Sequence, residues 1–315
     1  MDYLRPTLKE SIRQKAMELG FRAVGFAAVG PMEQAMARFR KMIADGRHGE
    51  MGYLEFGINA RENPSMLLPG ARTVISTALP WPERNSPYNP QGTVSSHAVI
   101  PDYHRTINIL LQELLEFVRS KSEDPVQGMV CVDSSPVLEK AWAEAAGIGR
   151  TGKNTMLIVP GAGSRLFLGE LLLDLAIEPD EPLEWDPCGT CTACLESCPT
   201  GALTQAGRLD ATRCISYLTI ELKREFTEQE AAMTEGWLYG CDRCTDACPC
   251  NEVNATTTET VFTPQEALVN LTAKDALELT GSGFRKLFAG TPGIRLGLRR
   301  LKRNARAVII KEKGP

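Results

Sequence analysis

The sequence contains no run approaching the ~18–20 consecutive apolar residues that a helix needs to cross a bilayer. Its opening residues, Met1-Asp2-Tyr3-Leu4-Arg5-Pro6, lack the apolar stretch of a secretory signal. No internal repeat and no low-complexity tract is visible, and a hydrophobic content of 43% excludes a disordered chain. We therefore expect a cytoplasmic protein without a membrane partner, and its 315 residues leave room for two or three domains.

Ten cysteines are many for such a protein, because cytosolic thiols stay reduced and a dense cysteine pattern then favours metal binding or catalysis over disulfides. Nine of the ten lie between Cys188 and Cys250, and Cys131 stands apart. This clustering predicts three segments: 1–180, 181–258 and 259–315. Three prolines within residues 179–187 predict an irregular linker between the first two.

The first segment alternates helical and strand-like patterns. Ser135 and Pro136 are typical of an N-cap and first-turn pair, so a helix is expected to begin directly after them. Hydrophobic patterning predicts helices over 7–19, 107–118 and 137–146, strands over 73–79, 129–133 and 156–159, and a further apolar run over 166–175. The pattern indicates a mixed α/β fold.

The cysteine spacing is typical of iron–sulfur clusters. Cys188-x2-Cys191-x2-Cys194-x3-Cys198-Pro199 matches the bacterial ferredoxin run, whose fourth cysteine ligates the other of two [4Fe–4S] clusters. A second run, Cys241-x2-Cys244-x3-Cys248-Pro249, is one cysteine short, and Cys214 supplies it. The predicted ligand sets are Cys188, Cys191, Cys194 and Cys248 for one cluster, and Cys198, Cys214, Cys241 and Cys244 for the other.

Zinc is the alternative, since paired cysteines also build tetrahedral zinc sites. Zinc requires neither a third ligand at the same spacing nor the Cys-Pro closures, so clusters are favoured. Cys131 and Cys250 remain over and are interpreted as small buried hydrophobic residues.

The glycines of 147–154 match G-x-G-x-x-G and nearly match a phosphate-binding loop. Both motifs require a strand before the glycines and a helix after them, whereas here the predicted order is reversed. We interpret the glycines as a helix end and turn that borders a site through Lys153 and Asn154.

The chain resembles the epoxyqueuosine reductase family, which makes the last step of queuosine in tRNA with cobalamin. In the cysteine region the resemblance rests on Cys188–Cys194, Cys198-Pro199-Thr200-Gly201-Ala202-Leu203, Arg213-Cys214-Ile215-Ser216-Tyr217 and Tyr239-Gly240-Cys241-Asp242. In the front half it rests on Arg61-x-x-Pro64, Asp102-Tyr103-His104, Val132-Asp133-Ser134 and the 147–154 segment. It covers residues 7–255.

The resemblance implies an α/β (α+β) cobalamin domain related to that of reductive dehalogenases, followed by a two-cluster ferredoxin-like domain and a short helical tail. It implies electrons passing through two [4Fe–4S] clusters to cobalamin. Asp133 matches the family's proton donor. The resemblance also implies cobalamin contacts, which are Arg61, Ser95, Asp133, Lys153, Asn154, Ser216 and Asp242. His104 is interpreted as structural.

Some of these assignments compete with simpler ones. Asp133 precedes a predicted helix start, where it would cap the helix and stay ionised; to act as an acid it must be desolvated. Residues 94–101, Arg150 and Cys250 depart from the family pattern, which puts the lining of the pocket in doubt.

Residues 285–315 hold ten basic residues and one acid, a concentration suited to RNA phosphates. The predicted tRNA contacts are Lys223, Arg224, Arg299, Arg300, Lys302 and Arg303. Longer family members continue into helical repeats, which this sequence does not contain. We expect a monomer that takes electrons from a donor protein or reductant. The alternatives are a reductase of small molecules, in the manner of the dehalogenases, and a ferredoxin without catalytic activity.

Overall fold

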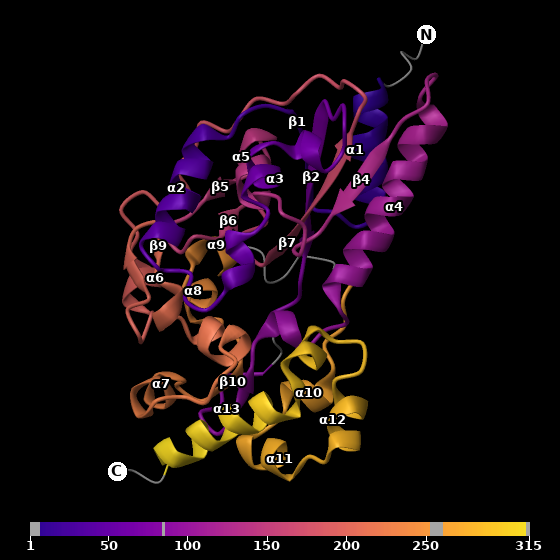
Figure 1. Cartoon of the computed structure of the whole chain (residues 1–315). Coiled ribbons are helices and arrows are strands. Elements are labelled where there is room, and N and C mark those ends of the chain that lie inside the picture. The colour runs from indigo at the N-terminus through magenta and orange to yellow at the C-terminus, as the bar shows by residue number, and fades with distance from the viewer. Residues whose placement is uncertain (1–6, 84–85, 253–260, 313–315) are drawn as a thin grey trace.

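The computed structural model describes residues 7–83, 86–252 and 261–312 (Figure 1). The N-terminal hexapeptide and the predicted boundary at residue 258 lie outside these ranges. None of the helices in the described ranges is long and apolar enough to cross a bilayer.

A four-stranded antiparallel sheet organises the front half. Its order is β1-β2-β7-β4, with β1 (Ala23–Ala28), β2 (Thr73–Pro80), β7 (Leu166–Leu173) and β4 (Gly128–Cys131). Every residue of β2 is buried, as expected for a strand whose two faces are both covered. The predicted strand at 73–79 is confirmed, the apolar run at 166–175 contains β7, and the antiparallel order makes the layer α+β.

Helices cover both faces of this sheet. On one side lie α1 (Leu8–Glu18) and α4 (Tyr103–Lys121), whose apolar stripe packs against β7 and β4, and on the other lies α5 (Glu139–Ala145). The α5 end approaches β1 so closely that a Cβ on Gly25 would lie 1.9 Å from the Ala146 carbonyl oxygen. The predicted helices at 7–19 and 107–118 are confirmed.

The third predicted helix begins later than expected. Ser135 and Pro136 do not cap it; α5 starts at Glu139. The preceding residues form a tight loop instead, in which the Val137 N–H donates to the Ser135 carbonyl at 2.8 Å. The strand before it also ends early, at Cys131, because Asp133 takes a left-handed backbone with φ 49°.

The cysteine-rich segment is built from short elements. They are α6 (Ala193–Glu196), β8 (Leu203–Gln205), β9 (Arg208–Leu209), η4 (Ala211–Arg213), the π-helix η5 (Tyr217–Glu221), α7 (Glu228–Met233), β10 (Trp237–Tyr239), α8 (Arg243–Asp246) and α9 (Pro249–Glu252). The linker at 179–187 has no regular structure, as predicted. Its Asp180 forms ion pairs with Lys9 and Arg13 of α1.

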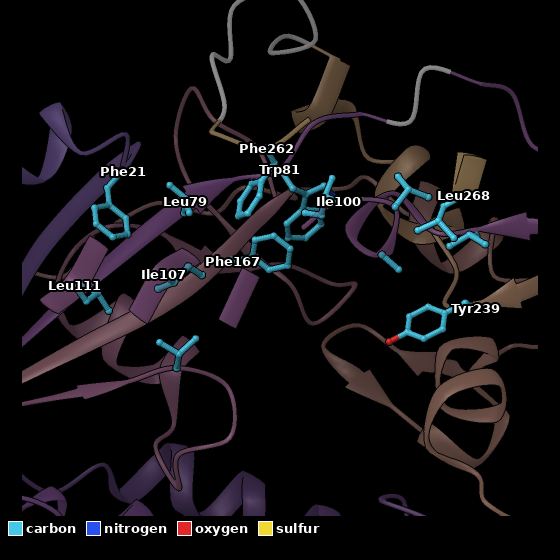
Figure 2. Packing of buried hydrophobic residues seen from close by; sticks show 14 of the residues in the cluster. Phe21, Leu79, Trp81, Ile100, Ile107, Leu111, Phe167, Tyr239, Phe262 and Leu268 are labelled. Atoms are coloured by element: carbon cyan, nitrogen blue, oxygen red, sulfur yellow. The ribbon is translucent and has the colours of Figure 1, made fainter. Parts of the chain in front are cut away.

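The predicted tail is several helices rather than one. They are α10 (Glu266–Val269), α11 (Ala273–Glu278), α12 (Gly281–Leu287), η6 (Pro292–Leu296) and α13 (Gly297–Glu312), which lie together at the bottom of Figure 1. Strand β10 pairs in parallel with β3 (Thr93–Val94) and packs on α13. One hydrophobic cluster joins residues of all three predicted segments, including Phe21, Tyr239 and Phe262 (Figure 2).

The remaining described elements lie around the sheet and at its edges. They are α2 (Glu33–Ala44), η1 (Gly52–Glu55), α3 (Ile58–Glu62), η2 (Pro64–Met66), η3 (Ser96–Ala98), β5 (Arg150–Thr151) and β6 (Leu157–Ile158).

Candidate functional site

Asp133 lies on the tight loop between β4 and α5. Its left-handed backbone is unusual for a residue with a Cβ. Its N–H donates to Glu139 Oε1 at 2.7 Å, so the first residue of α5 holds the loop. The side chain keeps 54% of its surface exposed, which leaves the carboxylate accessible to a reactant.

The Asp133 carboxylate contacts the imidazole of His104. The Asp133 Oδ2 and His104 Nε2 atoms are 2.6 Å apart, while the other ring nitrogen lies 2.7 Å from Asp102 Oδ1. His104 stands at the start of α4, and Asp102 also caps that helix by accepting the His104 N–H at 3.1 Å. The neighbouring Tyr103 stacks on Phe167 of β7 at 3.9 Å, which anchors this helix end to the sheet.

The protonation states follow from these contacts. Desolvation by the surrounding protein would raise the pKa of Asp133, but the hydrogen bond and charge of His104, with help from Tyr103 and Arg295, hold that pKa below its usual value. Desolvation would lower the pKa of His104, yet its bonds to Asp133 and Asp102 raise it. Both contacts favour the protonated imidazole, which lies between the carboxyl groups of Asp133 and Asp102.

Arg295 of η6 completes this group from the far end of the chain. Its Nη2 donates to Asp102 Oδ2 at 2.9 Å. Its Nη1 lies 3.0–3.1 Å from both nitrogens of His104. An imidazolium has no free lone pair to accept a hydrogen bond, so we assign the favourable Arg295 contact to Asp102.

This arrangement can deliver a proton. The accessible Asp133 oxygen is backed by an imidazolium that can resupply it, so the pair can act as a general acid even though Asp133 itself is ionised. Sequence reasoning took His104 as structural, but the geometry places it in the site. It also missed Glu139 and Arg295. The only signals were the position of Glu139 at the start of a predicted helix and the basic character of the C-terminal region.

Exposed aromatic and apolar side chains come from the segments next to this loop. Tyr53 is 56% exposed, Phe56 74% and Met66 61%. Desolvation, followed by the negative charges of Glu221 and Asp133, raises the pKa of Tyr53 to about 12. Since charge interactions of this kind are short-ranged, the end of η5 and Tyr53 both lie near Asp133.

The cysteines gather in two groups. Burial raises the pKa of Cys194, and the neighbouring thiols of Cys188, Cys248 and Cys191 raise it further. Burial likewise raises the pKa of Cys244, with Cys214 as its strongest thiol neighbour and Cys198 another. Cys241 in turn feels Cys244 and Cys214.

Cys194 of the first predicted set also acts on Cys244 of the second, and the assignment of the eight cysteines to two clusters stays a prediction. In the described part of the chain, no three His, Cys, Asp or Glu side chains converge closely enough for a single metal ion. Cys131 is fully buried, as interpreted, whereas Cys250 is partly exposed and lies beside the thiols of the first group.

The glycine-rich segment, residues 147–154, forms hydrogen bonds with both cysteine groups. The Lys153 backbone N–H donates to Cys188 Sγ at 3.3 Å, and its Nζ donates to the Gly189 and Cys191 carbonyls. Asn154 Nδ2 donates to the Cys244 carbonyl at 3.4 Å. Strands β5 and β6 form a hairpin here. A strand therefore follows the glycines, and the segment is the turn that the sequence order indicated.

The other predicted cobalamin contacts differ in their exposure and in their hydrogen-bond partners. Ser216 is partly exposed and directly precedes η5. Arg61 is 8% exposed and donates to the Phe56 carbonyl at 2.7 Å. Asp242 is 5% exposed and accepts the Ser96 N–H at 2.8 Å. Ser95 corrects an expectation: it is 0% exposed and hydrogen-bonded to His97 at 2.7 Å, so it has no surface for a cofactor.

Some of the predicted RNA contacts are exposed, and others are ion-paired or buried. Lys223 is exposed, Arg299 has a 72% exposed side chain and Lys302 is partly exposed. Arg224 is half exposed and ion-paired with Glu50 and Glu230.

Arg303 corrects the prediction: it is 3% exposed and donates to the Leu222, Arg224 and Leu218 carbonyls, so it is a structural residue and not an RNA contact. Arg300 is similarly occupied by three carbonyls, those of Leu296, Ile220 and Arg295.

Two family models and several known proteins match this chain. A family model described as "Epoxyqueuosine reductase QueG, DUF1730" matches residues 61–134, and one described as a 4Fe-4S double cluster binding domain matches residues 187–251. The chain is 38% identical over 293 residues to the epoxyqueuosine reductase of Cellulophaga algicola, covering 93% of this chain and 95% of the relative. It is 36% identical over 306 residues to that of Escherichia coli, covering 94% and 79%.

Solved structures of similar proteins also superpose on this chain. An epoxyqueuosine reductase bound to an epoxyqueuosine-modified tRNA stem loop superposes with a TM-score of 0.88 at 31% identity, covering 96% of this chain and 80% of that one. The Bacillus subtilis epoxyqueuosine reductase, described with its catalytic aspartate loop swung out of the active site, gives 0.86 at 30% identity, covering 96% and 81%.

Proposed function

The chain belongs to the epoxyqueuosine reductase family, and from this premise we propose that it reduces epoxyqueuosine to queuosine at the wobble position of tRNA. The reaction converts an epoxide into an alkene. It consumes two electrons and two protons, breaks both carbon–oxygen bonds and releases the oxygen as water. The enzyme must therefore deliver protons to a departing oxygen.

The observation that carries the proposal is the exposed Asp133 carboxylate backed by His104. The epoxide oxygen would approach Asp133 Oδ2, and a proton held on His104 Nε2 would pass through this carboxylate to it. Asp102 and Arg295 keep the imidazole oriented for that transfer. The fixed geometry of the four side chains lowers the entropic part of the barrier.

The cofactors fit the residues that surround this acid. We propose that Cys188, Cys191, Cys194 and Cys248 hold one [4Fe–4S] cluster and Cys198, Cys214, Cys241 and Cys244 the other. When bound, cobalamin would supply a strongly nucleophilic reduced cobalt centre, with electrons arriving through the clusters.

The apolar surface of Tyr53 and Phe56 beside the acid fits a large flat ring such as the corrin. Tyr53 would contact the ring. Ser216 lies between Cys214 and η5, so it would contact the cofactor from the side of the second cysteine group. Lys153, Asn154 and Asp242 would act by holding the cysteine segments and the adjoining loops in place.

The substrate would lie across the boundary between the cysteine segment and α13. Lys223 and Arg299 meet there, because Arg299 Nη2 donates to the Lys223 carbonyl at 2.9 Å. With Lys302 they offer exposed positive charge to RNA phosphates. A tRNA substrate and eight reduced ligand thiols would be consistent with a cytoplasmic enzyme, which we propose acts as a monomer with an external electron donor.

The loop that carries Asp133 is a candidate for movement. In the Bacillus relative the catalytic aspartate loop is swung out of the active site. We propose that residues 132–138 of this chain can do the same and that the bonded arrangement described above is the position with the aspartate in place.

The test is turnover of a defined RNA. The protein is reconstituted anaerobically with iron, sulfide and cobalamin, reduced, and incubated with an epoxyqueuosine-containing anticodon stem loop, whose nucleosides are then analysed by mass spectrometry. Queuosine should form only when clusters and cobalamin are both loaded. A fully loaded protein that leaves epoxyqueuosine unchanged would overturn the proposal.

A further inference from the structure

Glu139, the first residue of α5, holds the Asp133 loop through a hydrogen bond. Its Oε1 accepts the Asp133 N–H at 2.7 Å, so it bonds to the backbone of the acid rather than to its side chain. Asp133 stands at φ 49°, a left-handed conformation that a residue with a Cβ seldom adopts. Such a turn persists only where surrounding bonds hold it, and this hydrogen bond is one of them.

A second carboxyl group lies behind Glu139. Glu170 of β7 is 0% exposed, its Oε1 accepts the Ser76 hydroxyl at 3.3 Å, and its Oε2 has no hydrogen-bond partner in the described part of the chain. Complete burial raises the pKa of Glu170 well above its usual value, and the charge of Glu139 raises it further. Burial and the charge of Glu139 therefore both favour the neutral form of Glu170, which lies opposite Cys131 in the sheet.

We propose that Glu139 is a positioning residue that holds the loop in the position where Asp133 faces the substrate, by accepting the backbone N–H of Asp133. The proposal rests on the proposed reduction reaction for its effect on turnover. Its effect on the loop is independent of that reaction, because the hydrogen bond exists without substrate or cofactor.

The strength of the hydrogen bond between the Asp133 N–H and Glu139 should depend on pH. Desolvation, with the charge of Asp133, raises the pKa of Glu139 to about 7. The other charged or titratable groups facing it are His104 and Lys140, which lower its pKa, and Tyr103, Glu170 and Cys131, whose own pKa values its charge raises.

An ionised carboxylate accepts a hydrogen bond about twice as strongly as a neutral acceptor. The bond to Asp133 should therefore strengthen as pH rises through 7 and weaken as it falls.

The test compares three variants by hydrogen–deuterium exchange and single-turnover kinetics on the reconstituted protein. Glu139→Ala removes the acceptor, and Glu139→Gln keeps an acceptor oxygen that cannot ionise. The matched control is Glu144→Ala. Glu144 belongs to the same helix and accepts a backbone N–H in the same way, from Thr151 at 2.6 Å, away from the Asp133 loop.

Exchange of the Asp133 amide is expected to be about tenfold faster in Glu139→Ala than in the wild type and unchanged in Glu144→Ala. In the wild type, protection of this amide corrected for intrinsic exchange should rise severalfold, by about 3–10-fold, between pH 6 and 8. In Glu139→Gln it should not vary with pH. Single-turnover reduction by Glu139→Ala should be slower by about tenfold, with RNA affinity unchanged.

Unchanged protection of the Asp133 amide in Glu139→Ala would overturn the inference. If Glu139→Ala does not fold, Glu139→Gln decides alone, because a pH dependence like that of the wild type would equally overturn it. A wild-type protein that is fully loaded but inactive would overturn the proposed function instead, and the exchange data would still decide the role of Glu139.

Discussion

Replacing Arg303 with alanine is expected to destabilise the protein strongly while leaving the exposed basic residues Lys223, Arg299 and Lys302 unchanged. The guanidinium donates to the Leu222 and Arg224 carbonyls at 2.6 Å each and to the Leu218 carbonyl at 2.9 Å. It is 3% exposed, and although desolvation lowers its pKa to about 10, it is charged at neutral pH. These carbonyls lie in and just after η5, so Arg303 fixes the π-helix that brings Glu221 near Asp133.

The magnitude is estimated from the three bonds to carbonyls, beside which the guanidinium also donates to Asn304 Oδ1 at 3.0 and 2.8 Å. A hydrogen bond to a charged group contributes roughly 1.5–3 kcal/mol, and truncation leaves three inward carbonyls without a donor. Taking the low end for each gives a loss of about 4–5 kcal/mol in unfolding free energy. For a chain of 315 residues that corresponds to a fall in Tm of roughly 4–8 °C.

Thermal unfolding of the reconstituted variant, followed by circular dichroism, measures this loss. Arg306→Ala is the matched control from the same helix: Arg306 is 51% exposed and makes only a 3.4 Å ion pair with Glu225, so its Tm should change by less than about 1 °C. An Arg303→Ala protein with the wild-type Tm but weakened RNA binding would refute the structural assignment and restore the RNA-contact interpretation.

Three further predictions concern the acid, the clusters and the RNA surface. Asp133→Asn should slow single-turnover reduction by about 100–10,000-fold with RNA affinity unchanged; a variant at full rate would remove Asp133 from the mechanism. Cys214→Ser should abolish the electron paramagnetic resonance signal of one reduced cluster and leave the other, whereas two intact signals would contradict the ligand set. Replacing Lys223 and Arg299 together with alanine should reduce the slope of log affinity against log salt by about 1.4–1.8; an unchanged slope would place the phosphates elsewhere.

The cysteine chemistry could be predicted from sequence because its ligands occur at fixed local spacing. The double cluster domain is confirmed by the family model over residues 187–251. The strand β2 and helix α4 were predictable for a similar reason: β2 is a short, continuous apolar run, and the apolar residues of α4 repeat with helical spacing.

Long-range partners could not be predicted in this way. Arg295 meets Asp102 across 193 positions of sequence, and no local pattern marks that contact. Arg303 is a basic residue in a basic segment, which predicts an RNA contact. Its burial beneath η5 makes it a structural residue instead. The helix at α5 was placed two residues early because the left-handed turn at Asp133 outweighs the capping preference of Ser135 and Pro136.

The source of the proton is the central chemical claim, and the pH dependence of single-turnover reduction tests it most directly. The pKa of His104 lies above its ordinary value of 6.5, so its proton is present below that raised pKa and is lost as pH rises through it. The wild-type rate constant, measured with prereduced enzyme, should therefore fall as pH rises above that point. His104→Gln should be slower and should lack this decline. A His104→Gln enzyme with the rate and pH profile of the wild type would contradict the claim.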